Sequence, residues 1–232
     1  AAMSGCSWAS CRARAISRSD VPAPWAASTA AAVLRCWRVR AIVACSPVVA
    51  WYARMLAAIR ESVRESASYT GRTQLSDRVM SAMGSVPREE FVLPAYRHLA
   101  YDNTPLPIEA AQTISQPLIV ALMTDLLDPQ PSDVVLEVGT GSGYQAAVLA
   151  GLVEHVYSVE IVEQLAASAA DVLDRLGYDN VTVRAGDGYA GWPEHAPFDA
   201  IIVTAAAPEI PAPLLEQLKP GGKLVIPVGG EH

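Results

Sequence analysis

The chain has 232 residues, of which 51% are hydrophobic, and it carries a formal net charge of −7. This length and hydrophobic content are typical of a globular protein with a sizeable core. The acidic charge argues against a nucleic-acid partner, because such binding normally depends on a basic surface. No apolar stretch approaches the roughly twenty residues of a membrane-spanning helix, so we expect no membrane partner.

Residues 1–54 differ in composition from the rest of the chain. They hold all four cysteines, four of the five tryptophans, seven arginines, no lysine and a single acid, Asp20. We expect an atypical extension, disordered or mis-called, with Met55 as the natural start. Two alternatives stay open: a genuine basic tail, and an exported form in which residues 42–45 (IVAC) resemble a lipoprotein cleavage box.

The body that follows the extension contains no cysteine. Such a composition suits a reducing compartment and a fold without disulfides, so we expect a cytoplasmic protein. The four histidines are scattered along the chain, and no Cys/His cluster has the spacing of a zinc site. We therefore predict no metal.

Residues 55–130 are predicted to form a mainly helical N-terminal subdomain. Apolar residues recur at helical spacing along one face, with Leu75, Val79 and Met83 as the examples. This subdomain is expected to pack beside a sheet formed by the rest of the chain and to present Ser115 to it.

Ser115 precedes Gln116, Pro117 and an apolar periodic run. Its plainest role is helix N-cap, with proline in the first turn, where the missing N–H costs nothing. A helix N-terminus that carries a hydroxyl also favours binding of a carboxylate. The predicted cap is therefore also a candidate site.

Residues 134–150 (VVLEVGTGSGYQAAVLA) predict a buried strand, a glycine-rich loop and a helix. A dinucleotide fingerprint, G-x-G-x-x-G, would need a glycine where Tyr144 stands, which disfavours a pyrophosphate. Glu137, ahead of the loop, would repel phosphate but suits a ligand with a sulfonium or ammonium charge, such as S-adenosylmethionine. The glycines accept positive φ and let the backbone lie against that ligand; they are Gly139, Gly141 and Gly143.

Two further strands are predicted to end in carboxylates. Residues 155–161 form the first and contain Glu160, about twenty residues beyond the glycines, where a carboxylate would bind both ribose hydroxyls. A helix over residues 162–176 leads to the second, which ends at Asp187 and Gly188; Asp187 would take the adenine amino group. Each carboxylate alone could be a solvated loop or turn residue. Their coincidence at the ends of consecutive parallel strands favours one ligand site.

A strand over residues 198–206, a helix from Pro213 and a strand over residues 223–228 complete the alternating series. The series predicts an α/β fold, a doubly wound Rossmann-like sheet, with residues 131–232 as the cofactor-binding domain. The segment TAAAP, residues 204–208, lacks the Asp/Asn-Pro-Pro-aromatic pattern of enzymes that methylate base amines, and no cysteine for base-carbon methylation lies near it. Nucleic-acid substrates are therefore disfavoured.

Several segments together resemble the protein-L-isoaspartate O-methyltransferases, a family of S-adenosylmethionine-dependent class I enzymes. The most particular are TISQP, residues 113–117, and the run from GDG to IIVTAA, residues 186–206, whereas the glycine loop is common to many methyltransferases. The other matching segments are residues 86–108, 136–153, 156–160 and 218–229. The resemblance implies methyl transfer to the free α-carboxyl of L-isoaspartyl residues in damaged proteins and peptides, and repair through a succinimide.

The resemblance also implies roles for individual residues. Ser115 corresponds to the family's active-site serine and would orient the substrate carboxylate, with Thr204 as a second substrate contact. Glu137 would lie near the methionine part of the cofactor, Glu160 on the ribose, and Asp187 with Gly188 on the adenine. The implied cofactor-binding residues are Gln112, Thr113, Ile114, Glu137, Gly139, Gly141, Ser142, Gly143, Gln145, Glu160, Asp187 and Gly188.

The chain departs from the family pattern in two places. The family usually has glycines where this chain has Glu109 and Ala111, and a side chain at a position that needs positive φ would cost about 1 kcal/mol. Relatives also add further strands beyond the equivalent of residues 225–229, so we expect an exposed edge at the last strand. Two other functions remain open: a methyltransferase that acts on a small molecule, and an inactive S-adenosylmethionine-binding remnant.

Overall fold

The computed structural model of the chain describes residues 47–205 and 209–228. The expectations for residues 1–46 and for residues 206–208 lie outside the described residues. A five-stranded sheet forms the centre of the described part, in the spatial order β5-β4-β3-β6-β7. Its strands are β3 (Val134–Val138), β4 (His155–Glu160), β5 (Val181–Ala185), β6 (Phe198–Val203) and β7 (Leu218–Val225).

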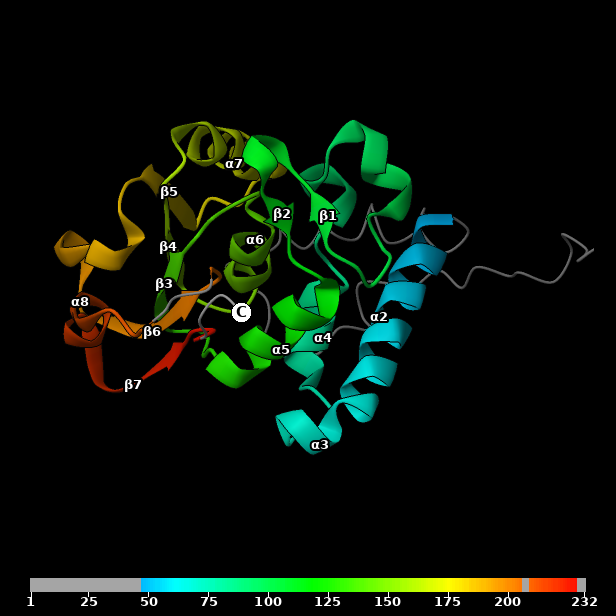
Figure 1. The fold of residues 1–232 in the computed structure, drawn as a ribbon, viewed down its shortest axis with the longest axis horizontal. Coiled ribbons are helices and arrows are strands. Elements are labelled where there is room, and N and C mark those ends of the chain that lie inside the picture. Colours follow the sequence, from blue (N-terminus) through cyan, green and yellow to red (C-terminus); the bar gives the residue numbers. More distant parts are fainter. Residues whose placement is uncertain (1–46, 206–208, 229–232) are drawn as a thin grey trace, which may run out of the picture. The chain divides into compact units, whose positions relative to one another are not determined.

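Every pairing in this sheet is parallel, so the predicted doubly wound Rossmann-like fold is confirmed. The strand order reverses at β3, whose two neighbours are β4 and β6. In open α/β sheets a crevice for ligands forms at such a reversal, outside the carboxyl ends of the strands. Figure 1 shows that the connection after β3 leads directly into α6 (Tyr144–Ala150) beside this point.

Apolar residues on the strands divide into two core layers, because successive side chains point to opposite faces of a sheet. One layer joins strand residues such as Val135 and Ile202 to α6 and to α7 (Glu163–Leu176). The other joins residues such as Leu136 and Ile201 to α8 (Ala212–Glu216), through the fully buried Leu214.

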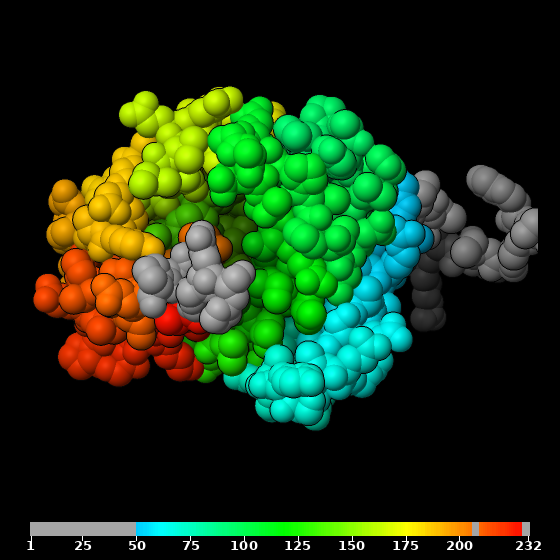
Figure 2. All heavy atoms as spheres, in the orientation of Figure 1, coloured from blue at the N-terminus to red at the C-terminus, as the bar shows by residue number. Residues whose placement is uncertain are grey.

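The N-terminal part is mainly helical, and its helices pack on one another. Helices α2 (Pro47–Glu65) and α4 (Asp77–Met83) both contact α5 (Pro117–Leu127), while α3 (Ala67–Thr70) follows α2. The expected apolar face is present, because Val79 and Met83 are buried and Leu75 packs against the same core. In Figure 2 the green residues lie between the blue and cyan residues of α2 and α3 on one side and the orange and red residues of the C-terminal part on the other.

Three features differ from the sequence expectations. Helix α2 begins at Pro47, so the compositional boundary near Met55 falls inside a helix whose buried face includes that residue. A short antiparallel pair, β1 (Leu106–Pro107) with β2 (Thr113–Ile114), was not predicted. Strand β7 begins at Leu218 rather than at residue 223, with a register irregularity where it pairs Phe198 and Ala200.

Strand β7 occupies one edge of the sheet in the described part of the chain. Among the residues that the structure describes, none of the helices combines the length and the apolar character that crossing a membrane would require.

Candidate active site

A cavity of about 610 Å³ opens at the carboxyl ends of the strands. Its volume lies within the range of small-molecule sites, and its position matches the strand-order reversal at β3. The wall combines the segment that leads into α5 with the loop after β3 and the ends of β4, β5 and β6. Twelve of the fourteen predicted site residues line it: Gln112, Thr113, Ile114, Ser115, Gly139, Gly141, Ser142, Gln145, Glu160, Asp187, Gly188 and Thr204.

The glycine loop adopts the backbone that the sequence predicts. Gly139 has φ 96° and Gly141 has φ 54°, both in the region that favours glycine. A Cβ on Gly139 would lie 2.6 Å from the Thr204 hydroxyl oxygen, and that hydroxyl donates to the Gly139 carbonyl at 2.5 Å. The end of β6 and the loop after β3 are therefore held in direct contact.

Gly143 does not line the cavity, although it also has positive φ, at 87°. It is the N-cap residue of α6, and a Cβ there would lie 3.3 Å from the Leu173 Cδ1 atom of α7. Glycine at this position therefore allows α6 and α7 to pack closely.

Glu160 ties the glycine loop to the end of β4. One carboxylate oxygen accepts the Gly141 N–H at 2.8 Å, and the other accepts the Val162 N–H at 3.0 Å. The side chain is 6% exposed and lies in the cavity wall. Because each carboxylate oxygen has a second lone pair, Glu160 can accept further hydrogen bonds from a ligand while it holds the loop.

Asp187 and Gly188 follow β5 at the next strand end. The Asp187 carboxylate accepts the Tyr189 N–H at 2.9 Å, which caps a short 3-10 turn. A Cβ on Gly188 would lie 2.4 Å from Val138 Cγ1, closer than real Cβ atoms approach a neighbour. The turn chemistry considered from the sequence is present, and it is combined with a place in the cavity wall.

Ser115 is not the N-cap of α5, so that expectation is wrong. The helix begins at Pro117, Gln116 occupies the cap position, and no side chain of the cap residue bonds to the helix. Instead the Asn103 side-chain oxygen accepts the Leu118 N–H at 3.0 Å, and the Gln116 amide donates to the Asn103 carbonyl at 3.0 Å. A residue distant in sequence therefore caps this helix.

The cap by Asn103 leaves the Ser115 hydroxyl available. Ser115 lines the cavity, and within residues 47–205 and 209–228 its side chain makes no hydrogen bond. Its carbonyl oxygen accepts a hydrogen bond from Arg88, at 2.9 Å. The residue is therefore held by its backbone carbonyl, and it lies in the cavity wall with a hydroxyl that no described residue binds.

Glu109 and Ala111, the positions where the resemblance implied glycine, differ from each other in backbone conformation. Ala111 has φ 55° and its neighbour Ala110 has φ 54°, so both alanines adopt the left-handed conformation. Glu109 does not; its carboxylate accepts hydrogen bonds from Gln164 at 3.2 Å and from Ser168 at 3.4 Å, both on α7. The departure at position 111 carries backbone strain, whereas the departure at position 109 adds a polar link to α7.

The substitution Ala111→Gly is expected to raise the free energy of unfolding by about 1 kcal/mol, because glycine adopts positive φ without a Cβ clash. Urea unfolding would measure the change. Ala57→Gly, at an exposed position inside α2, is the matched control and should lower the free energy by about 1 kcal/mol. A loss of stability in both variants would contradict the assignment of strain to Ala111.

Glu137 lies away from the cavity wall and is fully buried within β3. The Ser158 hydroxyl donates to one of its oxygens at 2.5 Å, while the other oxygen has no partner in the described part of the chain. Burial raises the pKa of Glu137 to about 8, with an addition from nearby Glu160, while the Ser158 hydrogen bond opposes the rise. Its carboxyl therefore belongs to the interior of the sheet.

The raised pKa of Glu137 makes stability depend on pH. In the unfolded chain a Glu carboxyl has a pKa of about 4.3, so between this value and about 8 the folded protein holds a proton that the unfolded chain releases. The free energy of unfolding therefore falls as pH rises through this window. Glu137→Gln removes the titration. The free energy of unfolding of the variant, relative to that of the wild type, should therefore rise by on the order of 2 kcal/mol between pH 6 and pH 9.

Urea unfolding at the two pH values would test this expectation. Glu154→Gln removes an exposed carboxylate and controls for the loss of one negative charge. A difference between Glu137→Gln and wild type that is the same at both pH values would contradict the pKa shift.

Some residues of the cavity were missed from the sequence. Tyr144 was considered only as an obstacle to a pyrophosphate, yet it lines the cavity and is almost fully buried. Three exposed side chains with large apolar surface also line it: Ile119, Ile161 and Tyr189. Tyr144 directly follows the glycine loop, a signal that could have placed it; the apolar residues carry no comparable signal.

The charged groups of the cavity wall are carboxylates. Glu160 and Asp187 lie in it, and no lysine or arginine does among residues 47–205 and 209–228. In the same part of the chain no group of three or more potential metal-ligating side chains comes together.

Comparison with known proteins adds sequence relatives. The family described as protein-L-isoaspartate(D-aspartate) O-methyltransferase matches residues 65–232. The chain is 61% identical over 184 residues to a protein-L-isoaspartate O-methyltransferase 2 of Syntrophobacter fumaroxidans, covering 79% of this chain and 74% of the relative. It is 60% identical over 175 residues to a protein of the same name from a Polaromonas species, covering 75% and 83%.

Solved structures agree with the sequence relatives. One, a protein-L-isoaspartate O-methyltransferase, has a TM-score of 0.63 and 34% identity, with 73% of this chain and 55% of that chain covered. Another is a protein-L-isoaspartate O-methyltransferase from Plasmodium falciparum in complex with S-adenosyl-L-homocysteine, with a TM-score of 0.60, 28% identity and coverage of 75% and 85%.

Proposed function

Because the chain belongs to the protein-L-isoaspartate(D-aspartate) O-methyltransferase family, we propose that it methylates the free α-carboxyl of isoaspartyl residues in damaged proteins and peptides. S-Adenosylmethionine is the methyl donor, and the ester then closes to a succinimide that hydrolyses partly to normal aspartate. The observation that carries the proposal is that a free serine hydroxyl and the glycine loop share one cavity.

The residues of the cavity fit S-adenosylmethionine. The glycine loop forms a cradle that a Cβ on Gly139 would fill, and the two carboxylates of the wall suit a ligand with positive charge and hydroxyl groups. In this proposal Glu160 binds the ribose, Asp187 binds the adenine amino group, and Gln112, Thr113 and Ile114 line the cofactor and substrate. When bound, the cofactor supplies a methyl group on a positively charged sulfur that departs as a neutral thioether.

The reaction needs orientation more than it needs a base. An α-carboxyl group has a pKa of about 3.5, so at neutral pH the substrate is already an ionised nucleophile. Ser115 would donate a hydrogen bond to this carboxylate and hold one oxygen in line for attack, with Thr204 as a neighbouring contact. Such alignment contributes several kcal/mol to a rate, up to about 7–11 in intramolecular reactions.

The two parts of the chain would have different tasks. Residues 55–130 would carry the serine segment with Gln112, Thr113 and Ile114, and residues 131–232 would carry the glycine loop and the two carboxylates of the cofactor site.

The test uses methyl-labelled S-adenosylmethionine and two peptides that differ only in an aspartyl or an isoaspartyl linkage. Base-labile label on the isoaspartyl peptide alone is the expected result. Label on both peptides would overturn the substrate assignment. Label on neither, with the cofactor still bound in calorimetry, would favour a small-molecule methyltransferase or an inactive binder.

A further inference from the structure

Arg88 has the largest fully buried side chain of the described residues, with 0% exposure. Its Nε donates to the Ala100 carbonyl at 2.8 Å, and its Nη2 donates to the Ser115 carbonyl at 2.9 Å. In the described part of the chain its Nη1 has no partner, and no carboxylate forms an ion pair with it. An unpaired buried charge costs several kcal/mol, so its position calls for a reason other than stability.

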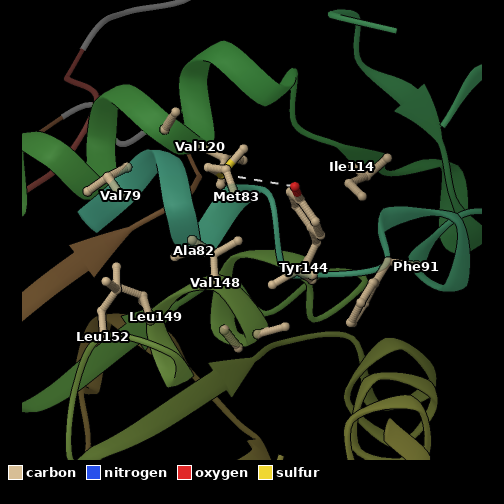
Figure 3. Close-up of a cluster of buried hydrophobic side chains, with 14 of the residues drawn as sticks. Val79, Ala82, Met83, Phe91, Ile114, Val120, Tyr144, Val148, Leu149 and Leu152 are labelled. Carbon is tan, nitrogen blue, oxygen red and sulfur yellow. Dashed lines mark hydrogen bonds between the residues drawn. The ribbon is translucent and has the colours of Figure 1, made fainter. Parts of the chain in front are cut away.

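The guanidinium also contacts the first residue of the helix after the glycine loop. Its central carbon lies 4.6 Å from the centre of the Tyr144 ring, a cation–π geometry. Figure 3 shows Tyr144 between Met83 and Phe91; its ring meets Phe91 edge-on at 5.7 Å and its hydroxyl lies 4.0 Å from the Met83 sulfur. Arg88 therefore joins the serine segment to the start of α6 through a ring that is itself held in place.

The charge of Arg88 complements the cavity. The substrate carboxylate must enter a cavity whose charged side chains, in the described part of the chain, are two carboxylates. Arg88 does not itself line the cavity, but it binds the backbone carbonyl of Ser115, which does. Burial lowers the pKa of Arg88 and the Tyr144 ring opposes this, but an arginine starts so high that it stays charged. At low local dielectric its attraction for an anion at Ser115 is stronger than in water.

We propose that Arg88 is a positioning residue for the methyl transfer: it fixes Ser115 relative to the glycine loop and supplies the positive charge that favours a carboxylate beside Ser115. The inference rests on the proposed function. It differs from a structural role, since it requires discrimination between a charged and a neutral substrate group.

The test compares the wild type with Arg88→Met, Arg88→Lys and the control Arg97→Met, which removes an exposed neighbouring arginine. For each protein, kcat and KM are measured with an isoaspartyl peptide, and the inhibition constant with the same peptide as its neutral α-carboxamide. Arg88→Met should lower kcat/KM about 100-fold and bind carboxylate no better than carboxamide. Arg88→Lys should keep the wild-type preference but lower kcat about tenfold, because an ammonium lacks the planar fork.

Two results would overturn the inference. One is a wild-type kcat/KM in Arg88→Met. The other is an equal loss of affinity for carboxylate, carboxamide and S-adenosylmethionine, which a merely structural role predicts. Arg97→Met should match the wild type throughout.

A further measurement needs no variant. In the wild type the preference for carboxylate over carboxamide should persist in about 1 M salt, since buried charges are screened much less than exposed ones; its disappearance would assign the preference to a surface charge and overturn the inference. If the wild type does not methylate the isoaspartyl peptide, the proposed function fails and the inference falls with it. If the wild type is active and Arg88→Met is unchanged, the inference fails alone.

Discussion

Replacing Ser115 by alanine is expected to lower kcat/KM for an isoaspartyl peptide by about 100-fold, because a misaligned nucleophile loses that much in rate. The affinity for S-adenosylmethionine and the free energy of unfolding should stay close to wild type. The reason lies in the helix cap: Asn103 binds the Leu118 N–H, so the serine hydroxyl stabilises no helix that its loss would weaken. Steady-state kinetics, calorimetry and urea unfolding measure the three quantities.

Ser76→Ala is the matched control for this prediction. Ser76 does cap a helix, since its hydroxyl oxygen accepts the Val79 N–H at the start of α4. Its loss should lower the free energy of unfolding by about 1 kcal/mol and leave kcat/KM unchanged. If Ser115→Ala lost stability and kept its activity, the serine would be a cap after all and the proposed role would be wrong.

Glu160→Ala is the second substitution with a large expected effect. It removes two hydrogen bonds: the one from the Gly141 N–H, which ties the glycine loop to β4, and the one from the Val162 N–H just after β4. Hydrogen bonds to a charged group are worth about 1.5–3 kcal/mol each, and the proposed ribose contacts would be lost as well. We expect the Kd for S-adenosylmethionine to rise by at least about 100-fold, measured by calorimetry.

The control for this second prediction is Glu163→Ala, an exposed carboxylate in the first turn of α7. It removes the same charge from nearly the same place and should leave the Kd almost unchanged. Equal affinities of Glu160→Ala and wild type would mean that neither the loop nor the ribose depends on this carboxylate.

The sheet and one half of the site could be predicted from the sequence because their signals are local. A buried strand, a glycine loop and a helix follow one another within residues 134–150, and parallel strands bring their carboxyl ends together by construction. Glu160 and Asp187 could therefore be expected at one cavity from chain order alone. The positive φ values of Gly139 and Gly141 follow from the same local pattern.

The other half depends on contacts between residues far apart in the chain. Asn103 caps α5 from 15 positions away, and Arg88 reaches Ser115 across 27 positions. No spacing rule links such residues, so the sequence pattern of serine, glutamine and proline predicted a local cap that the fold does not use. The residues that hold the serine could be identified only from the structure.

The sequence could not show that Glu137 and Glu160 have different surroundings. It stands one position before the end of β3, whereas Glu160 ends β4. That difference puts Glu137 opposite Ser158 in the sheet and buries it, while Glu160 reaches the loop and the cavity. Sequence identified both as carboxylates near strand ends, but the register of the two strands decided which of them a ligand can meet.

The close contact at Gly188 bears on how the protein ages. A Cβ at position 188 would lie 2.4 Å from Val138 Cγ1, so packing requires glycine after Asp187. The peptide nitrogen of a glycine has no Cβ beside it to hinder its attack on the carboxyl carbon of the preceding aspartyl side chain. The cavity wall thus contains an Asp–Gly bond, the kind of linkage in which isoaspartate forms with least steric hindrance. The Tyr189 N–H donates to the Asp187 carboxylate and holds it at the start of the turn that follows. Packing against Val138 therefore retains an Asp–Gly linkage in the wall of the proposed cofactor site.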